Sequence, residues 1–437
     1  MNSVLIKNAL IVTVDNDMKI IRNGYLVMKK DIIIDIGEMQ NLEENNFKEI
    51  IDAKNKIVMP GLINAHTHIA MAFFKGLADD LPLKKWLNDY IWPAENKLLN
   101  FDFVKDASAY GISDLIKNGT TTFSDMYFLE DAVAESVEKI GVRGILGEGV
   151  VDFPIAGFKN ATEKLDKTRK LYEKYKENKR IEISVAPHSI YACSRDTLLK
   201  VSELARELDI VQHIHLSESK GEVKSSLKDN NKRPGDYLLD LGFFDNTKTV
   251  ISHGVWFSTD EIRKLAAKDV HLSLCTESNL KLASGFARIA ELIKEKLPFC
   301  YGTDGVASNN NLSLLEEMGY TAKLAKALGN DPTLLSAKRT IKNATITAAS
   351  AYGLDNKIGS LEKGKQADLI FIDINNVETQ PIYDVYSHLV YNISSDKITD
   401  LFVAGKRLMR DRKLLTVNET AMLNKAREYK KRVIEAV

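Results

Sequence analysis

The sequence is poor in cysteine and shows no sign of export. Only Cys193, Cys275 and Cys300 occur among 437 residues, and none has the CxxC spacing typical of redox or metal motifs. The N-terminal stretch MNSVLIKNALIVTVD reads as a β-strand and lacks the basic region and cleavage site of a signal peptide. A disulfide scaffold is therefore excluded, and we expect a protein of the reducing cytoplasm whose cysteines are small core residues.

The sequence also lacks an excess of charge, because 60 Lys and Arg residues balance 60 Asp and Glu residues. Lysine-rich stretches such as KLYEKYKENKR contain interspersed glutamates, which is typical of a solvated helix face. No apolar run approaches the roughly 18 uncharged residues that a membrane-spanning helix needs. We therefore expect neither nucleic acid nor a membrane as partner, and the length predicts one large domain with a smaller companion.

Strand and helix patterns alternate through the middle of the chain. Eight apolar runs have β-strand character, at residues 57–68, 120–126, 143–149, 181–188, 210–216, 248–254, 270–275 and 298–304. Helical stretches of mixed charge separate them. Eight repeated strand–helix units predict an α/β fold with a closed (β/α)8 barrel, known as a TIM barrel. An open doubly wound sheet is the alternative, but no GxGxxG turn follows the early strands.

Both ends of the chain contain short strand-like segments separated by polar turns. SVLIKNALIVTVD and GYLVMKKDIIIDIG lie near the start, and KGKQADLIFIDI and DLFVAGKRLM lie near the end. We predict that the two ends pair into one small β-sandwich domain. Residues 1–57 and 359–437 form this domain in our prediction, with a C-terminal helix over 421–437, and residues 58–358 form the barrel.

Two histidines end the first of the eight runs, in the stretch GLINAHTHIA. His66 and His68 are two residues apart, so their side chains point to the same side of a strand. Two imidazoles that converge favour a metal, although such a pair is at least as often a hydrogen-bonded polar patch.

The other histidines strengthen the metal interpretation by their positions. The C-terminal ends of predicted strands carry His66, His68, His188, His215, His253 and Asp304. In a (β/α)8 barrel, these ends form the face where catalytic residues gather. His213 lies inside a strand and is interpreted as a core histidine, and His271 and His388 carry no motif.

Three histidines and one carboxylate suit a catalytic metal. His66, His68, His215 and Asp304 offer three nitrogens and one oxygen, and such a site leaves a position open for water. This set suits one divalent ion, Zn²⁺ or Fe²⁺. No lysine ends the fourth strand to bridge a second metal. Metal coordination lowers the pKa of water from 15.7 towards ~7, which supplies a nucleophile at neutral pH.

Two further residues are candidates for proton transfer. Glu218 follows His215 by three residues in HLSES, and its carboxylate can pass a proton from water to a substrate. The alternative is a glutamate that merely stabilises a helix N-terminus. His253, at its own strand end, can hydrogen-bond the water and help to deprotonate it, and Asp304 orients it.

Several motifs together resemble those of the amidohydrolase superfamily. They are PGLINAHTH, HIHLSES, SHG, SNLKLASG, GTDGVASNN and the terminal KGKQADLIFID with VAGK, and they span essentially the whole chain. Within the superfamily, TTFSDMYF and GTDGVASNN resemble the 5'-methylthioadenosine/S-adenosylhomocysteine deaminase group. The resemblance implies the same four ligands, a proton shuttle at Glu218, a water-activating His253 and a homo-oligomer.

The resemblance also implies a substrate and its contacts. Glu95 in WPAENKL would bind ribose hydroxyls, and His188 in APHSIY would contact the purine. From the residues themselves, Trp86 and Trp92 are candidates for the pocket wall, although aromatic loop residues more often serve packing. The implied reaction is hydrolytic deamination of the 6-amino group of 5'-methylthioadenosine, S-adenosylhomocysteine, 5'-deoxyadenosine or adenosine, with water as co-substrate. The alternatives are deamination or dechlorination of guanine, a pterin or a triazine. Two other classes of protein are also alternatives. A non-catalytic scaffold should have lost some of the metal ligands, which this chain retains. A binding protein for a small polar ligand would bind metal but show no turnover.

Two positions depart from the pattern. Some relatives that accept S-adenosylhomocysteine carry an arginine at the end of the third strand, where this chain has Glu148. We predict that Glu148 faces the substrate and repels a carboxylate-bearing 5' group. The stretch before SNLKL reads CTE, where the pattern has a proline. We predict that this departure places Glu277 near the pocket.

Overall fold

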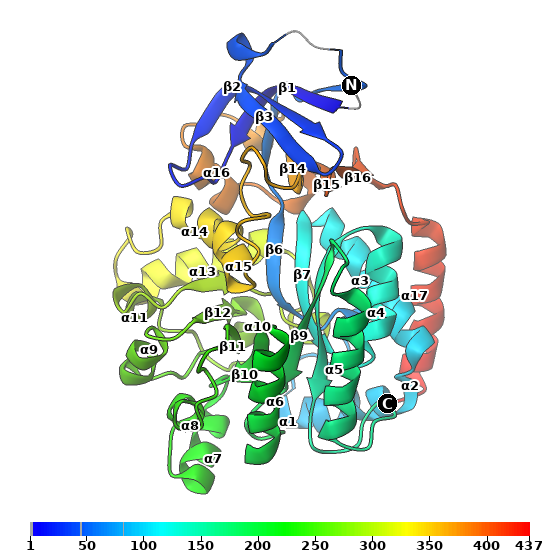
Figure 1. Ribbon diagram of the computed structural model, residues 1–437, viewed down its shortest axis with the longest axis vertical. Coiled ribbons are helices and arrows are strands. Elements are labelled where there is room, and N and C mark those ends of the chain that lie inside the picture. Colours follow the sequence, from blue (N-terminus) through cyan, green and yellow to red (C-terminus); the bar gives the residue numbers. More distant parts are fainter. Residues whose placement is uncertain (1–2, 44–45, 82) are drawn as a thin grey trace.

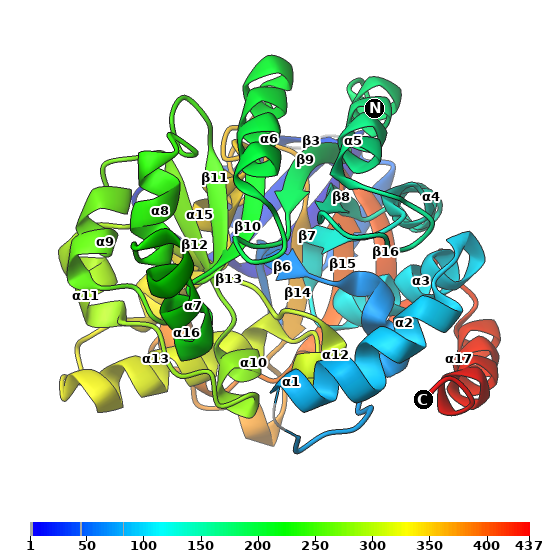
Figure 2. The same ribbon diagram turned by 90° about the horizontal axis from the view of Figure 1, so that it is seen from below.

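The computed structural model describes residues 3–43, 46–81 and 83–437. Eight strands form a parallel sheet whose order follows the chain (Figures 1 and 2). They are β6 (Leu62–Thr67), β7 (Thr120–Tyr127), β8 (Arg143–Val150), β9 (Ile181–Pro187), β10 (Gln212–Leu216), β11 (Thr249–His253), β12 (Val270–Leu274) and β13 (Phe299–Tyr301). Nearly every residue of these strands is buried, as expected for a parallel sheet that is covered on both faces.

The sheet closes into a barrel between β6 and the residues after β13. The amide of Asp304 donates to the carbonyl of His66 at 3.0 Å. Asn64 Nδ2 donates to Thr303 Oγ1 at 2.8 Å, and the Thr303 amide donates back to Asn64 Oδ1 at 3.1 Å. The predicted (β/α)8 barrel is therefore confirmed, and its seam lies beside two of the proposed ligands.

Helices surround the barrel and cap its rim. They are α1 (Leu83–Trp86), α2 (Trp92–Leu98), α3 (Phe101–Lys117), α4 (Glu130–Ile140), α5 (Ala161–Tyr175), α6 (Arg195–Leu208), α7 (Lys220–Asn230), α8 (Pro234–Asp240), α9 (Thr259–Leu265), α10 (Thr276–Lys281), α11 (Ile289–Lys294), α12 (Val306–Asn309), α13 (Leu314–Gly329), α14 (Ala337–Asn343), α15 (Ile346–Ala351), α16 (Val385–Tyr391) and α17 (Glu419–Ile434). Local sequence sets where many begin. Ser194 caps α6, and Ser258 and Glu261 form a capping box at α9.

Both ends of the chain build a second, mostly antiparallel sheet of nine strands at one end of the barrel (Figure 1). Its strands are β1 (Ser3–Val12), β2 (Ile20–Lys29), β3 (Ile32–Glu38), β4 (Glu49–Asp52), β5 (Lys56–Pro60), β14 (Leu369–Asp373), β15 (Ile398–Val403), β16 (Lys406–Arg410) and β17 (Lys413–Leu414). Strand β5 joins the two ends by pairing with β1 and β14. Phe371 and Phe402 stack within a separate core there.

The run 57–68, which we predicted as one strand, is two strands in the structure. β5 belongs to the small sheet and β6 belongs to the barrel, and the change falls at Gly61. A Cβ at Gly61 would lie 2.1 Å from the Thr121 side chain, so the chain can cross between the sheets only with glycine there.

The C-terminal helix packs on the barrel, whereas we had placed it with the small sheet. Helix α17 lies along α3 and α2 (Figure 1). Tyr429 stacks on Phe73 with ring centroids 4.7 Å apart and meets the edge of Phe103 at 5.2 Å. The apolar face of α17 therefore packs on the outer layer of the barrel.

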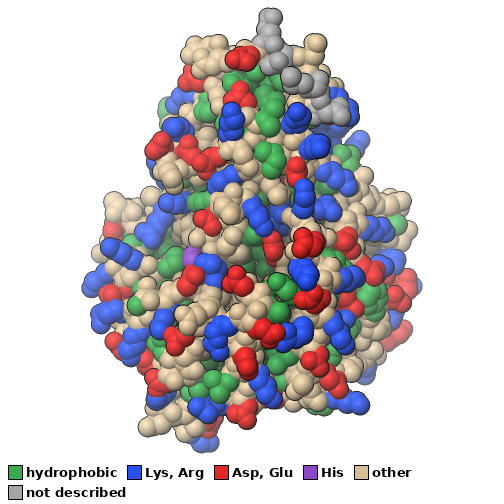
Figure 3. Space-filling view, in the orientation of Figure 1, with side chains coloured by type: hydrophobic (Ala, Val, Ile, Leu, Met, Phe, Trp, Pro, Cys, Tyr) green, Lys and Arg blue, Asp and Glu red, His purple; other side chains and the backbone are tan. Residues whose placement is uncertain are grey.

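The charged surface agrees with the balanced composition. Lysine and arginine side chains are interspersed with aspartate and glutamate over the face in Figure 3. Within the described residues, we find no helix that is both long and apolar enough to cross a membrane.

A buried ion pair links the barrel to the part of the small sheet that the C-terminal end of the chain forms. We expect this pair to contribute to stability. Arg143 is fully buried and contacts Asp368 at 3.0 Å, also donating to the Lys179 carbonyl at 2.6 Å. Arg143→Leu should lower the free energy of unfolding by about 3–5 kcal/mol, because it leaves the Asp368 charge buried and unpaired. Urea unfolding measures this loss.

An exposed pair gives the matched control for this prediction. Arg169 contacts Glu207 through two hydrogen bonds of 2.5 and 2.6 Å at the surface. Arg169→Leu should cost less than about 1 kcal/mol, because water already screens the pair. Equal losses in both variants would show that burial of the Arg143 pair contributes nothing special.

Candidate metal centre and active site

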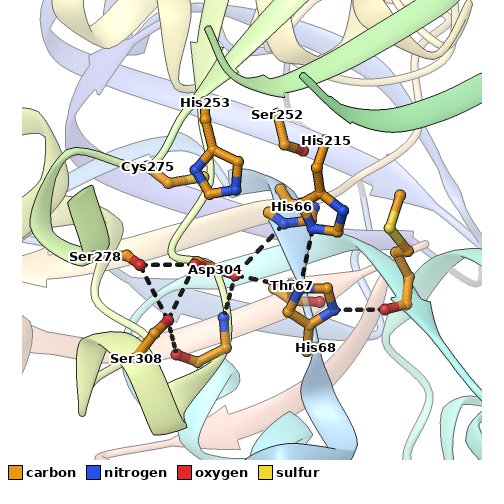
Figure 4. Close-up of polar contacts among 12 residues, drawn as sticks. His66, Thr67, His68, His215, Ser252, His253, Cys275, Ser278, Asp304 and Ser308 are labelled. Atoms are coloured by element: carbon orange, nitrogen blue, oxygen red, sulfur yellow. Dashed lines mark hydrogen bonds and ion pairs between the residues drawn. The ribbon is translucent and has the colours of Figure 1, made fainter. Parts of the chain in front are cut away.

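The predicted ligands meet at the end of the barrel away from the small sheet. Strand β6 begins next to the small sheet, so its C-terminal end and those of its parallel neighbours lie at the opposite face, which Figure 2 views. Figure 4 shows His66, His68, His215 and Asp304 pointing toward one another there, with His253 beside them. These side chains belong to the C-terminal ends of four strands or to the residues that follow them, and His66 and Asp304 lie 238 positions apart in the chain.

Four donor atoms converge on one point. Asp304 Oδ1 lies 3.5 Å from His66 Nε2 and 3.2 Å from His68 Nε2, and His215 Nε2 lies 3.3 Å from His68 Nε2. The Nε2 atom of His66 is buried without a hydrogen-bond partner. Three nitrogens and one carboxylate oxygen at these separations match the donor set of a catalytic zinc site.

Hydrogen bonds on the far side of two rings point their Nε2 lone pairs inward. His68 Nδ1 donates to the Met126 carbonyl, and His215 Nδ1 donates to the His188 carbonyl at 2.8 Å. The Nε2 atoms of His68 and His215 lie 3.3 Å apart, so one cation placed beside them can bind both. The residues present therefore fit a metal ion.

Burial and hydrogen bonding set the charges of these groups. Burial lowers the pKa of His66 to about 3 and that of His215 well below its ordinary value, so both are neutral. Burial alone would raise the pKa of Asp304, but the neighbouring rings of His66 and His68 hold it well below its ordinary value. Burial alone would lower the pKa of His68 too, but its hydrogen bond with Asp304 and the charge of that carboxylate raise it to about 9. A metal that binds here therefore displaces a proton from His68, because neutral imidazoles and ionised carboxylates are the forms that bind metals.

Two serines orient the carboxylate of Asp304. Its Oδ2 accepts hydrogen bonds from Ser278 at 2.6 Å and from Ser308 at 3.0 Å, as Figure 4 shows. The Gly305 amide donates to Oδ1 at 2.8 Å. The two serine hydroxyls thus hold Oδ2 through hydrogen bonds, and Oδ1 faces the histidines.

The two predicted proton-transfer residues face each other beside the ligands. Glu218 Oε2 lies 3.9 Å from His253 Nε2. His253 Nδ1 lies 3.0 Å from Asn279 Oδ1 and donates to it, so its Nε2 is an acceptor that faces the site. Burial raises the pKa of Glu218 above its ordinary value, which suits a group that both takes and gives a proton.

A cavity of about 370 Å³ opens from these residues to the surface. Predicted site residues that line it are His68, Trp86, Glu95, His188, His215, Glu218, His253 and Asp304. The rest of the lining is largely apolar, from Met71, Leu87, Ile91, Met126, Phe128, Val151, Ile155, Ala192 and Leu282. Trp92, Phe153 and Tyr191 also line it and are 45%, 48% and 62% exposed, so aromatic rings surround its mouth.

Glu95 is held inside the cavity by a tyrosine. The Tyr127 hydroxyl donates to Glu95 Oε1 at 2.5 Å, and burial raises the pKa of Glu95 to about 7. His188 also lines the cavity, and burial lowers its pKa to about 4, so its ring is neutral. Trp86 forms part of the wall and donates its Nε1 proton to the Leu77 carbonyl at 3.0 Å.

The structure does not place Glu148 in the cavity, contrary to our expectation. Its side chain is fully buried and accepts hydrogen bonds of 3.0 Å from the amides of Leu129 and Glu130, at the start of α4. Neighbouring strand residues point to opposite sides of a sheet, and Gly149 is the residue of this pair that borders the cavity. The predicted repulsion of a substrate carboxylate by Glu148 therefore loses its basis.

Glu277 also lies outside the cavity lining. Its Oε1 accepts a hydrogen bond from Asn311 at 3.3 Å. The two residues that follow Glu277 are the functional ones. Ser278 donates a hydrogen bond to Asp304, and Asn279 accepts one from His253. Their presence in the SNLKL motif was the available signal, whereas the partnership of Tyr127 with Glu95 had no signal in the sequence.

Comparison with known proteins agrees with this geometry. The model of the amidohydrolase family matches residues 57–408. The chain therefore belongs to the amidohydrolase family, as its motifs had indicated.

Individual relatives narrow the comparison. The chain is 42% identical to the 5-methylthioadenosine/S-adenosylhomocysteine deaminase of Thermodesulfovibrio yellowstonii, over 98% of both chains. It is 40% identical to the 5'-deoxyadenosine deaminase of Methanobrevibacter smithii, over 100% of this chain and 99% of the relative. The crystal structure of an adenosine deaminase from Xanthomonas campestris with bound zinc has a TM-score of 0.97 and 32% identity, over 99% of both chains.

Proposed function

We propose that this protein is a zinc-dependent deaminase that hydrolyses the 6-amino group of 5'-substituted adenosines to the inosine form and releases ammonia. The observation that carries the proposal is one cavity lined by His68, His215 and Asp304, by the Glu218–His253 pair and by the buried Glu95. The ring of His66 lies against this group, within 4.8 Å of His68 and His215 and of Asp304 and His253. Relatives named as deaminases of 5'-methylthioadenosine, S-adenosylhomocysteine and 5'-deoxyadenosine support the substrate class. The zinc-bound adenosine deaminase supports the choice of metal.

Each residue has a defined task in this proposal. His66, His68, His215 and Asp304 hold the metal, which when bound lowers the pKa of water and so supplies the nucleophile. Glu218 takes a proton from that water and delivers it to N1 of the adenine ring. His253 accepts a hydrogen bond from the water through Nε2 and holds it toward C6. Glu218 then takes the remaining proton from the new C6 hydroxyl and passes it to the amino group. The C6–N bond breaks, ammonia leaves, and C6 keeps the oxygen as a carbonyl.

The lining of the cavity favours uncharged 5' groups. None of its described residues is a lysine or an arginine, and apolar side chains such as Val151, Phe153 and Ile155 line it. A carboxylate buried there would lose water without gaining a cation, which is costly. We propose that 5'-methylthioadenosine and 5'-deoxyadenosine are preferred over S-adenosylhomocysteine.

Ammonia release from a panel of substrates tests the proposal. The zinc-loaded protein should act on 5'-methylthioadenosine, 5'-deoxyadenosine and adenosine, with a lower kcat/KM for S-adenosylhomocysteine and none for guanine. Turnover of guanine but not of the nucleosides would overturn the nucleoside assignment. A clear preference for S-adenosylhomocysteine would overturn the proposed 5' specificity and leave the reaction intact.

The role proposed for Glu95 predicts a pH dependence of KM. Its carboxylate would accept hydrogen bonds from the ribose hydroxyls, and its pKa is raised to about 7. As pH falls from 8 to 6 the group gains a proton and loses an acceptor, so KM should rise, by up to about tenfold per pH unit below the pKa. Measuring KM across this range tests the sign.

Glu95→Gln gives the control for the pH experiment. The amide cannot titrate, so its KM should be high and independent of pH between 6 and 8. Loss of a hydrogen bond to a charged group costs about 1.5–3 kcal/mol, and KM should rise by about 10- to 150-fold at pH 8. An unchanged pH profile in this variant would assign the titration to another group.

A further inference from the structure

The three histidines of the proposed metal site differ in what holds the ring nitrogen that faces away from the metal. In His68 and His215 this nitrogen, Nδ1, donates to a backbone carbonyl oxygen. In His66 it lies 3.1 Å from Nε2 of another side chain, His213. Support for His66 therefore depends on a residue that mutation can change.

His213 lies directly behind His66 in the barrel. It precedes His215 by two residues in β10, so both side chains point into the barrel, and it is fully buried. The ring centroids of His213 and His66 are 4.9 Å apart. Its own ring nitrogens meet two serines, with Nδ1 3.2 Å from Ser124 Oγ and Nε2 2.9 Å from Ser252 Oγ.

A metal bound to His66 selects one arrangement of protons among those that these contacts allow, because each serine hydroxyl can donate or accept. A neutral imidazole carries a single N–H. When Nε2 of His66 binds the metal, the proton of His66 lies on Nδ1 and is donated to Nε2 of His213. The proton of His213 must then lie on its Nδ1, where Ser124 Oγ accepts it. The chain from His66 through His213 to Ser124 thus has one consistent direction of donation.

We propose that His213 is a positioning residue that holds the ring of His66 and its tautomer, and so raises the affinity of the site for its metal. This inference rests on the metal site proposed above. Partners that orient a metal ligand in this way typically contribute 10- to 100-fold in affinity or activity. His213 was interpreted from the sequence as an ordinary core histidine, because its contact with His66 joins residues 147 positions apart.

Metal affinity in three variants tests the proposal. His213→Met removes the acceptor, and His213→Gln keeps a polar atom that can accept. His271→Met is the matched control. His271 is a buried histidine of β12, and its Nδ1 has no hydrogen-bond partner. Competition for Zn²⁺ with a chromogenic chelator gives the affinity, and the absorption spectrum of the Co²⁺-loaded protein reports the ligand field.

We expect His213→Met to weaken Zn²⁺ binding by about 10- to 100-fold and to change the Co²⁺ spectrum. His213→Gln should recover most of the affinity, and His271→Met should match the wild type. Thermal unfolding in excess chelator shows whether the variants fold, independently of the metal.

The outcomes separate this inference from the function on which it rests. A wild-type protein that binds no metal would overturn the metal site and this inference together. A wild type that binds Zn²⁺ no more tightly than His213→Met would overturn the role of His213 alone. So would an equal loss of affinity in His213→Met and His271→Met, because that result would indicate a general effect on folding.

Discussion

Replacing Glu218 with glutamine is expected to lower kcat for deamination by about 10²- to 10⁴-fold. Glu218 lines the cavity 3.9 Å from His253, next to the four proposed ligands. Glutamine keeps the shape of the side chain but cannot accept the proton of water or deliver it to the adenine ring. KM and the zinc content should change little, since the residue is not among the ligands. Steady-state kinetics with 5'-methylthioadenosine and metal analysis measure both.

Glu277→Gln is a suitable control for this experiment. Glu277 is a partly buried carboxyl at the start of α10, and it does not line the cavity. Its replacement should leave kcat unchanged. Retention of more than about a tenth of the wild-type kcat in Glu218→Gln would contradict the prediction. Such a loss would be far smaller than the contribution of general acid–base catalysis, and Glu218 would then not be the proton shuttle.

Removing the metal is expected to abolish activity. The pKa of water returns from ~7 toward 15.7 without a metal, so we expect kcat at pH 7 to fall by at least about 10⁴-fold after dialysis against a chelator. Addition of Zn²⁺ should restore it. Metal should also raise the thermal stability, because an ion that binds only the folded state shifts the unfolding equilibrium.

Asp304→Ala links this effect to the proposed ligands. The change removes the carboxylate that faces His66 and His68 at 3.5 and 3.2 Å. Zn²⁺ should then neither restore activity nor raise the melting temperature to the wild-type extent. Full restoration by Zn²⁺ in this variant would show that the metal binds elsewhere.

Much of the fold and of the candidate site could be predicted because the responsible signals are local. The alternation of apolar runs with amphipathic helices is repeated eight times, and it indicates a barrel without knowledge of any contact. The face that holds the side chains also follows from local position, since the C-terminal ends of barrel strands always lie together. His66, His215 and Asp304 could thus be grouped from their places at strand ends.

The wrong expectations concern residues whose roles depend on neighbours distant in the chain. Glu148 stands at a strand end, but one position of alternation turns it toward the amides of α4 and leaves Gly149 at the cavity. The C-terminal helix was assigned by its nearness in sequence to the small sheet. Its apolar face instead packs on Phe73 and Phe103, more than 320 positions earlier.

The sequence by itself determined the type and order of the elements, the family and the residues that meet at the end of the barrel. Periodicity, strand ends and motifs are written in neighbouring residues, and they need no knowledge of the folded packing. Only the tertiary structure decided which side chains support the site, such as Tyr127 at Glu95, Asn279 at His253 and His213 at His66. These contacts form because the folded barrel brings strands and rim helices that are distant in the chain within hydrogen-bonding distance. The SNLKL motif marked Asn279 as a residue of interest, but no local sequence encodes which side chain it contacts.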